Sequence, residues 1–318
     1  MRALALATVL AAVAAGAVPA GATAGAPRCS GAAARDPEHR CHDPRLRLRV
    51  APTPDDAELT PNVACTRTGT DESEVEPCAV GLGADRAAET VAMLGDSHAA
   101  HWRAGIDVLA RAEGWRVLEV GTPHCPFSFA TPKPDATNAD AWCVDWNRTR
   151  IAWLAGRPAI RTVLVSANAR APVTVPEGAT ELETRVQGFV QAFTALPASV
   201  ERIVVLRDTP QIRLGTHDCV RRAMRRRVPA GRRCAVGRRW SLPVDAAVVA
   251  ARRLTGRAAR VVDLTPHFCT RRACLPVVGG VLVHKDEDHL TQDFARTLGP
   301  YLRRAIDRLR WPEPVPAG

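Results

Sequence analysis

From Glu89 onward, the chain alternates short apolar runs with longer amphipathic stretches. The apolar runs predict strands at residues 90–94, 116–120, 162–167, 202–206 and 259–263. The amphipathic stretches predict helices at residues 99–113, 144–155, 182–196, 244–254 and 292–309, with Thr291 as the N-cap of the last helix. Strands and helices in alternation are typical of right-handed crossovers on a parallel sheet. We therefore expect an α/β fold, a three-layer α/β/α sandwich at residues 86–310.

The segments on either side of this domain differ from it in composition. Residues 25–85 are rich in proline, glycine, alanine and charge, which predicts an irregular, disulfide-stapled N-terminal extension. Residues 1–24 have a basic start, an apolar run and small residues before Ala24, the order of a secretory signal peptide cleaved near Ala24. An uncleaved membrane anchor is the alternative interpretation of this run. Residues 311–318 are rich in proline and predict an extended tail.

The ten cysteines agree with export, because disulfides persist in oxidising compartments. Ten thiols allow many connectivities, but consecutive cysteines lie closer together than the gaps between successive pairs. We expect consecutive pairing, which closes five short loops: Cys29 with Cys41, Cys65 with Cys78, Cys125 with Cys143, Cys219 with Cys234, and Cys269 with Cys274. Zinc is the competing interpretation. The chain contains no CxxC pair or related zinc spacing, so disulfides are favoured.

Composition narrows the class of protein. The chain has 318 residues, of which 46% are hydrophobic and 24% charged, which indicates a folded, soluble protein without further membrane spans. The formal net charge is +10, and nearly all positive charge is arginine. Nine arginines cluster between residues 221 and 239, across the expected Cys219 to Cys234 loop. Anionic envelope polymers or lipid headgroups are candidate partners of this cluster, and a solvated surface is the simpler interpretation. Nucleic acid is disfavoured as a partner, because aromatic residues are scarce in this stretch and the protein is expected to be exported.

One serine lies at the end of the first predicted strand, a position at which folds of this class bind ligands. The sequence Gly95-Asp96-Ser97-His98 follows the first predicted strand and precedes a helix. Ligands of open parallel sheets bind at the carboxyl ends of the strands, and a helix N-terminus offers free backbone N–H groups to an oxyanion. Ser97 is therefore a candidate nucleophile, although such a turn is also an ordinary helix N-cap.

A serine nucleophile needs a base, and that base needs an orienting partner. Asp286-Glu287-Asp288-His289 lies just before the last predicted helix. We expect His289 to face Ser97 with Asp286 fixing the imidazole tautomer, as in a catalytic triad. Asp288 is the rival orienting residue. A solvated acidic loop with an incidental histidine is the simpler interpretation of this segment alone.

These two motifs resemble those of the SGNH (GDSL-like) hydrolase superfamily. More narrowly, they resemble the extracytoplasmic SGNH domain that bacterial membrane acyltransferases of family 3 carry at their C-terminus. Supporting matches are Cys125-Pro126 with Cys143, the segment from Leu206 to Pro210, and Val262-Asp263-Leu264-Thr265 ahead of the last cysteine pair. The resemblance covers residues 60–310.

The resemblance implies a domain that acts on O-acyl groups of cell-envelope sugars, with Ser97 as nucleophile, His289 as general base and Asp286 as its partner. It also implies that Gly121 and Asn168 complete the oxyanion hole. The block around Asn168 reads Ser-Ala-Asn where the superfamily has glycine, any residue, asparagine, so Arg170 is a rival donor. The polytopic acyltransferase domain is missing, so its acyl donor would come from a separate protein.

The other histidines near Ser97 do not indicate a metal site. His98, His101 and His124 lack a supporting carboxylate pattern, so we expect them to contact protein or substrate, and we expect no metal or cofactor. The leading hypothesis is a secreted serine esterase or O-acyltransferase that works through an acyl-enzyme on O-acyl, chiefly acetyl, groups of envelope glycans. The alternative is a catalytically silent envelope-binding module that holds anionic polymer with its arginine-rich loop.

Overall fold

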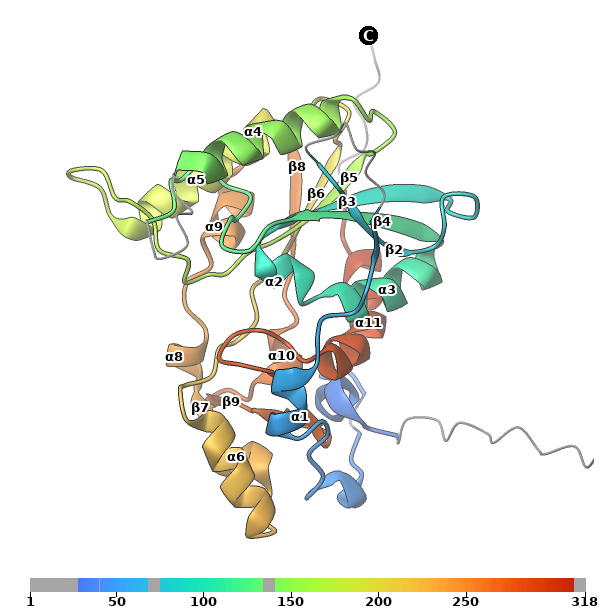
Figure 1. The fold of residues 1–318 in the computed structure, drawn as a ribbon, viewed down its shortest axis with the longest axis vertical. Coiled ribbons are helices and arrows are strands. Elements are labelled where there is room, and N and C mark those ends of the chain that lie inside the picture. Colours follow the sequence, from blue (N-terminus) through green and yellow to red (C-terminus); the bar gives the residue numbers. More distant parts are fainter. Residues whose placement is uncertain (1–27, 40, 68–74, 134–140, 312–318) are drawn as a thin grey trace, which may run out of the picture.

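A computed structural model of the chain describes residues 28–39, 41–67, 75–133 and 141–311. Its centre is a seven-stranded sheet in the order β1-β2-β4-β3-β5-β6-β8 (Figure 1). The strands are β1 Thr66–Arg67, β2 Cys78–Gly81, β3 Glu89–Gly95, β4 Trp115–Gly121, β5 Thr162–Ser166, β6 Arg202–Leu206 and β8 Ala258–Val262. The five strands from β4 to β8 in this order are parallel, and β1 and β2 form an antiparallel edge.

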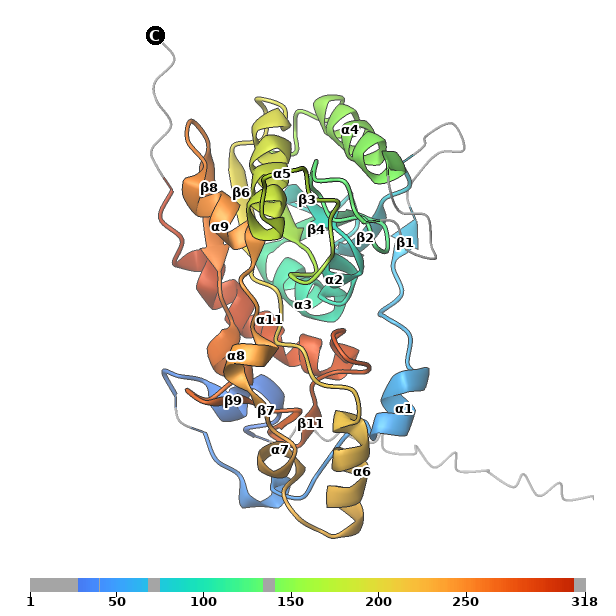
Figure 2. The same cartoon turned by 90° about the vertical axis from the view of Figure 1, so that its left-hand side faces the viewer.

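Helices cover both faces of the sheet and make the three expected layers (Figure 2). Helices α3 Arg103–Glu113 and α11 Gln292–Asp307 pack on one face, and α4 Ala141–Ala155, α5 Glu181–Ala195 and α9 Ala246–Arg253 pack on the other. The central strand β3 serves both cores, because Val91 and Met93 point to one and Ala92 and Leu94 to the other. Each large side chain buried this way contributes roughly 1.5–3 kcal/mol to stability.

The five parallel strands and the helices of the sandwich confirm the predicted α/β fold. Thr291 caps α11 as expected, since its hydroxyl accepts a hydrogen bond from the Phe294 backbone N–H at 3.1 Å. Two details differ. The helix expected at residues 99–113 is divided into α2 Ser97–Ala100 and α3, because Trp102 bonds back only three residues, to Ala99 O, and tightens the turn. The sheet is mixed, because the short β2 pairs antiparallel with β4.

All five consecutive disulfides are present: Cys29–Cys41, Cys65–Cys78, Cys125–Cys143, Cys219–Cys234 and Cys269–Cys274. The second of them ties β1 to β2 at the antiparallel edge of the sheet. The predicted signal peptide lies outside the described residues. So does the predicted tail after Trp311, whose ring lies against Arg202 and Arg260. No helix within the described ranges has the length and hydropathy that crossing a bilayer requires.

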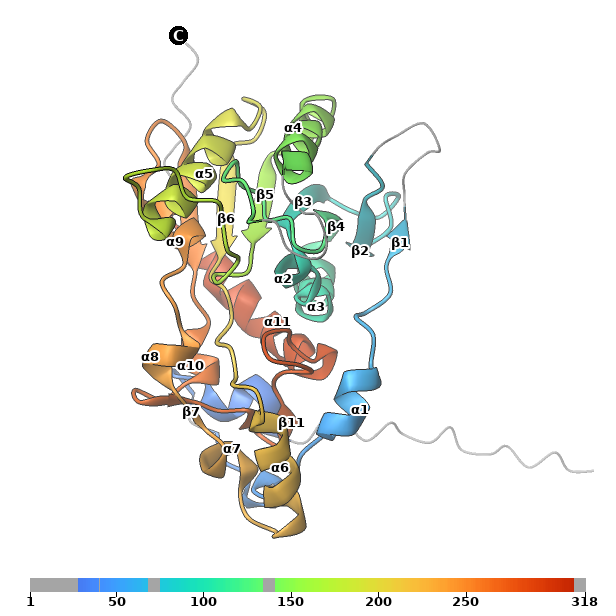
Figure 3. The same cartoon turned by 60° about the vertical axis from the view of Figure 1, so that its left-hand side comes forward.

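A smaller lobe lies below the carboxyl ends of the strands (Figure 3). It joins η1 Gly31–Arg35, η2 Pro44–Leu46 and α1 Pro54–Leu59 of the N-terminal segment to α6 Thr216–Arg225, α7 Ala230–Arg233 and the β10–β11 hairpin, Val277–Val278 with Val281–Leu282. Its own small core contains Ala57, Val220, Ala230 and Leu282. The short elements α8 Arg238–Ser241 and α10 Thr265–Phe268, and the β7–β9 pair of Val236–Gly237 and Ala273–Cys274, connect this lobe to the sandwich.

Candidate active site

The site gathers where three parallel strands end. Ser97 follows β3, Asn168 follows β5 and Asp208 follows β6. Because β3, β5 and β6 are adjacent and parallel, their carboxyl ends meet at one edge of the sheet. The strand order from β4 to β8 reverses at β3, so Ser97 stands at the topological switch point where open α/β sheets bind ligands.

Gly95 allows the turn that presents Ser97. A Cβ at this position would lie 1.9 Å from the carbonyl oxygen of Ser166, and the glycine φ is +155°. No side chain fits at such a distance, so only glycine lets β3 and β5 approach this closely. Asp96 then caps α2, because its carboxylate accepts a hydrogen bond from the His98 backbone N–H at 2.8 Å. The serine is thereby fixed at the start of the helix.

The structure brings Ser97, His289 and Asp286 together. His289 Nε2 lies 2.8 Å from Ser97 Oγ, and His289 Nδ1 lies 2.9 Å from Asp286 Oδ2. Asp286 also accepts a hydrogen bond from the His289 backbone N–H at 2.7 Å, which fixes the loop on which the imidazole stands. The far ring nitrogen therefore faces the serine while the near one meets a carboxylate, the arrangement expected from the sequence.

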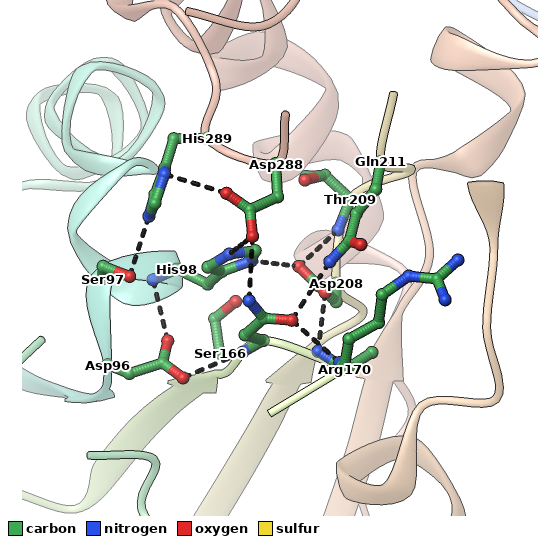
Figure 4. A network of polar contacts seen from close by, with 12 residues as sticks. Asp96, Ser97, His98, Ser166, Arg170, Asp208, Thr209, Gln211, Asp288 and His289 are labelled. Atoms are coloured by element: carbon green, nitrogen blue, oxygen red, sulfur yellow. Dashed lines mark hydrogen bonds and ion pairs between the residues drawn. The ribbon is translucent and has the colours of Figure 1, made fainter. Parts of the chain in front are cut away.

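Asp288 is a second carboxylate on the same ring nitrogen. Its Oδ1 lies 3.0 Å from His289 Nδ1, and its Oδ2 accepts a hydrogen bond from Asn168 Nδ2 at 3.0 Å. Figure 4 shows Asp288 between His289 on one side and His98 on the other. His98 Nε2 lies 3.5 Å from Asp288 Oδ2. The two carboxylates considered from sequence are thus both partners of His289.

Behind Asp288 lies a buried ion pair. His98 Nδ1 is 2.6 Å from Asp208 Oδ1, and both side chains are almost fully buried. Asp208 is held in turn by the backbone N–H of Ala169, at 2.8 Å from its Oδ2. The backbone N–H of Asp208 donates to Asp245, the N-cap of α9. A continuous polar chain thus runs from Asp245 to the nucleophile, and Figure 4 shows its part from Asp208 to Ser97.

The charges in this chain shift the pKa values of its members. Burial lowers the pKa of His289, but hydrogen bonds to Asp286 and Asp288 outweigh it and raise the pKa to about 9. Burial also opposes charge on His98, yet its contacts with Asp208 and Asp288 hold its pKa well above the usual value. Burial favours the neutral acids, but hydrogen bonds to His289 outweigh it and lower the pKa of both Asp286 and Asp288. The two histidine rings therefore alternate with the carboxylates that raise their pKa values.

Gly121, Asn168 and Arg170 are the oxyanion candidates, and they differ in whether they have a hydrogen-bond donor left for a substrate oxygen. Gly121 ends β4 opposite Gly95, where a Cβ would lie 3.2 Å from Glu119 Oε1. Asn168 Nδ2 donates one hydrogen to Asp288, which leaves its second hydrogen for another acceptor. Arg170 directs its guanidinium away from Ser97 and donates to the carbonyl of Trp240 (Figure 4). Asn168 is thus better placed than Arg170 to donate beside the serine.

A cavity of about 110 Å³ opens beside the nucleophile. Ser97, His124, Lys133, Asn168 and Pro172 are among its lining residues. His124, one of the histidines that the sequence places near Ser97, lines this cavity and adopts a left-handed φ of +62°. A small substrate group in this cavity would contact Ser97.

In the part of the chain that the structure describes, two sets of three side chains lie close enough to share a metal ion, and both contain His98. One set is His98, His101 and Asp208, and the other is His98, Asp288 and His289. In the geometry present, the His98 contact with Asp208 is a short hydrogen bond. A metal on the second set would compete with Ser97 and the carboxylates for His289. Burial, together with the nearby His98 and His289, lowers the pKa of His101 well below its usual value, so this ring is neutral.

Comparison with known proteins identifies the family. Residues 64–304 match the model of the SGNH domain (fused to AT3 domains). The chain belongs to this SGNH domain family. No curated protein matches the sequence.

Among solved structures, the SGNH domain is similar to the periplasmic domain of a Salmonella ser. Paratyphi A lipopolysaccharide acetyltransferase, with 14% identity and a TM-score of 0.53. That alignment covers 69% of this chain and 84% of the other. A mutant of esterase rPPE aligns over 85% of this chain and 93% of its own at 10% identity, with a TM-score of only 0.34. Family membership and the Ser97–His289 contact together support an esterase- or acyltransferase-type activity.

The sequence predicted the Ser97, His289 and Asp286 side chains that the structure brings together, but not the residues behind them. It assigned no role to Asp208 or Gln211, whose amide donates to Asn168 Oδ1 at 3.1 Å, and it placed no carboxylate beside His98. One signal was present, because Asp208 comes two residues after the predicted strand 202–206, much as Ser97 comes three residues after the predicted strand 90–94. A polar residue at the carboxyl end of each parallel strand is the pattern that would have found it.

Proposed function

We propose that this SGNH domain is a serine esterase or O-acyltransferase that acts on O-acyl groups, chiefly acetyl, of cell-envelope glycans. The observation that carries the proposal is the 2.8 Å contact of Ser97 Oγ with His289 Nε2, in a ring whose other nitrogen meets carboxylates. Five disulfides support a site of action outside the cytoplasm.

The first half of the proposed reaction acylates the serine. Ser97 Oγ attacks the ester carbonyl carbon while His289 Nε2 takes the hydroxyl proton. The tetrahedral oxyanion is stabilised by the N–H of Ser97 at the start of α2, by Gly121 and by the free hydrogen of Asn168 Nδ2. Collapse of this intermediate breaks the bond to the sugar oxygen, and His289 returns the proton to that oxygen as it leaves.

The second half returns the enzyme to its starting state. Water or a sugar hydroxyl attacks the acyl carbon of the Ser97 ester, and His289 takes its proton. Release of Ser97 Oγ, which recovers the proton from His289, gives a free acid when water attacks and an acylated sugar when a hydroxyl attacks. The cavity of about 110 Å³ beside Ser97 is of a size that favours a short acyl chain.

Hydrolysis of p-nitrophenyl acetate tests this function. The wild type is expected to release p-nitrophenol, and Ser97→Ala and His289→Ala are each expected to lose roughly 10³-fold or more in kcat/KM. His39→Ala is the matched control, because this histidine side chain is 76% exposed and, among the described residues, its polar contacts are with Asp36 and Arg304 only. Equal melting temperatures establish that each variant is folded. An oxidised, folded wild type without esterase activity contradicts the proposal.

A further inference from the structure

Two segments that are far apart in sequence lie side by side in the lower lobe (Figures 2 and 3), and each carries a cluster of arginines. One lies in the N-terminal segment around η2, at Arg45, Arg47 and Arg49. The other is the arginine-rich stretch of α6 and α7, which the Cys219–Cys234 disulfide folds into a hairpin. We call the two together the cationic lobe. Only folding brings these clusters together, since about 180 residues separate them.

Most of this charge has no acidic partner. Within the described residues, the carboxylates near the lobe pair with only two of its arginines: Asp43 with Arg45, and Asp55, Glu58 and Asp218 with Arg221. Exposed arginines of the lobe that form no ion pair within the same ranges are Arg47, Arg49, Arg222, Arg225, Arg226, Arg227, Arg232 and Arg233. Such a concentration of unpaired guanidinium groups attracts anions, and arginine binds carboxylate and phosphate groups in bidentate geometry.

A cavity of about 440 Å³ lies between the two clusters. Arg47 of the N-terminal segment and Arg232 of α7 both line it, Asp43 lines it too but pairs with Arg45, and an apolar part of the lining comes from Leu46, Leu275 and Val277. The Cys29–Cys41 disulfide forms part of the wall and holds the N-terminal segment in place. Ligand sites in proteins have volumes of roughly 300–1,000 Å³ and combine apolar lining with a few polar groups, as this cavity does.

We infer that this cavity is a binding site for an anionic polysaccharide, in which Arg47 and Arg232 pair with a carboxylate or phosphate group on the sugar. This cavity shares no lining residue with the cavity at Ser97. It would therefore bind a part of the polysaccharide that is distant from the reacting ester. The choice of a glycan rests on the proposed function. The choice of an anionic ligand rests on the arginines alone.

The lobe fits a glycan better than other polyanions. Single-stranded nucleic acid is bound through stacking on aromatic side chains, and neither arginine cluster contains phenylalanine, tyrosine or tryptophan. A bilayer surface is flat, whereas Arg47 and Arg232 line a hollow between two segments of chain. A sugar ring places apolar C–H groups against lining residues such as Leu46 while its anionic group faces the arginines.

Binding of polygalacturonate, a carboxylated polysaccharide, tests the inference. The full chain carrying Ser97→Ala is used, so that the result does not depend on turnover. We expect binding that weakens with salt, no binding of neutral dextran, and about tenfold weaker binding in Arg47→Ala/Arg232→Ala. The control is Arg86→Ala/Arg252→Ala, which removes the same charge from two exposed arginines outside the cavity and is expected to change binding by no more than about twofold.

Two results overturn the inference. Equal loss in the two double variants shows that net charge and not the cavity binds the polymer. Binding to phosphatidylglycerol vesicles but not to polygalacturonate shows that the lobe meets a membrane. Failure of the proposed function is separate, because it appears as a wild type without esterase activity whatever the polysaccharide does.

Discussion

The imidazole of His98 and the carboxylate of Asp208 form a buried ion pair, with Nδ1 2.6 Å from Oδ1. This pair stands behind Asp288, which contacts both His98 and His289. The position of the base therefore depends on the side chains of Asp208 and His98, neither of which is hydrogen-bonded to the Ser97 hydroxyl. Preorganisation of this kind is what a serine enzyme requires, because misplacement of the base by a fraction of an ångström lowers the rate.

Removal of one partner of this pair is expected to be costly. His98→Asn leaves Asp208 buried without its counterion, and we expect it to lower the free energy of unfolding by about 3–5 kcal/mol. Urea denaturation measures this loss. Asp208→Asn removes the opposite partner and is expected to have a similar effect. A His98→Asn protein as stable as the wild type contradicts the ion pair.

Stability is also expected to depend on pH through His98. Its pKa is raised by Asp208 and Asp288 against burial, with Asp96 and the histidines His101 and His289 also facing the ring. A pKa raised on folding stabilises the protein fully below the unfolded value of about 6.5, and this stability is lost as pH rises through the folded pKa. The stability advantage of the wild type over His98→Asn should therefore shrink above about pH 6.5. An advantage that grows with alkaline pH contradicts the assignment.

Asp286 and Asp288 are both expected to help orient the imidazole of His289. Asp286→Asn and Asp288→Asn should each retain partial activity, because one carboxylate still meets Nδ1 in each variant. The double variant should lose more than the product of the two single losses. Measured kcat/KM values for the three variants give this coupling. A double variant no worse than Asp286→Asn alone leaves Asp288 without a role at the base.

The rate is expected to rise with pH because His289 accepts a proton only when neutral. With a pKa of about 9, the rate of the free enzyme should climb up to about pH 9. Asp288→Asn removes one interaction that favours the protonated ring, so the midpoint of the kcat/KM profile should move to lower pH. A profile that does not move shows that Asp288 leaves the pKa of His289 unchanged.

Gly95→Ala tests the turn that presents the nucleophile. The added Cβ would lie 1.9 Å from Ser166 O, so β3 and β5 must separate and both stability and esterase activity should fall, stability by about 2–4 kcal/mol. Gly237→Ala is the matched control, since nothing lies within 4 Å of the added Cβ there and its φ is −55°. Thermal denaturation and the esterase assay distinguish the two variants.

The sandwich and the disulfide pairing could be predicted because each leaves a local signal. Strands such as β3 and β5 are apolar runs bounded by polar residues, and the cysteine pairs close short loops. The two-residue β1 and four-residue β2 were missed because so short a strand carries no periodicity.

The site was only half visible from the sequence. Ser97 and His289 stand in recognisable motifs, whereas the His98 contact with Asp208 joins residues 110 positions apart. The convergence of Arg47 and Arg232 on one cavity was hidden for the same reason. Pairings across a fold depend on the packing of its elements, and a single sequence carries no record of that packing.

The most direct test of the central claim is mass spectrometry of the protein after brief exposure to p-nitrophenyl acetate and acid quenching. The account predicts one added acetyl group on the peptide that contains Ser97, and no such addition in Ser97→Ala or in His289→Ala at the same exposure. An active wild type whose acetyl group is found on another residue, or whose Ser97→Ala variant keeps full esterase activity, contradicts the acyl-enzyme at Ser97.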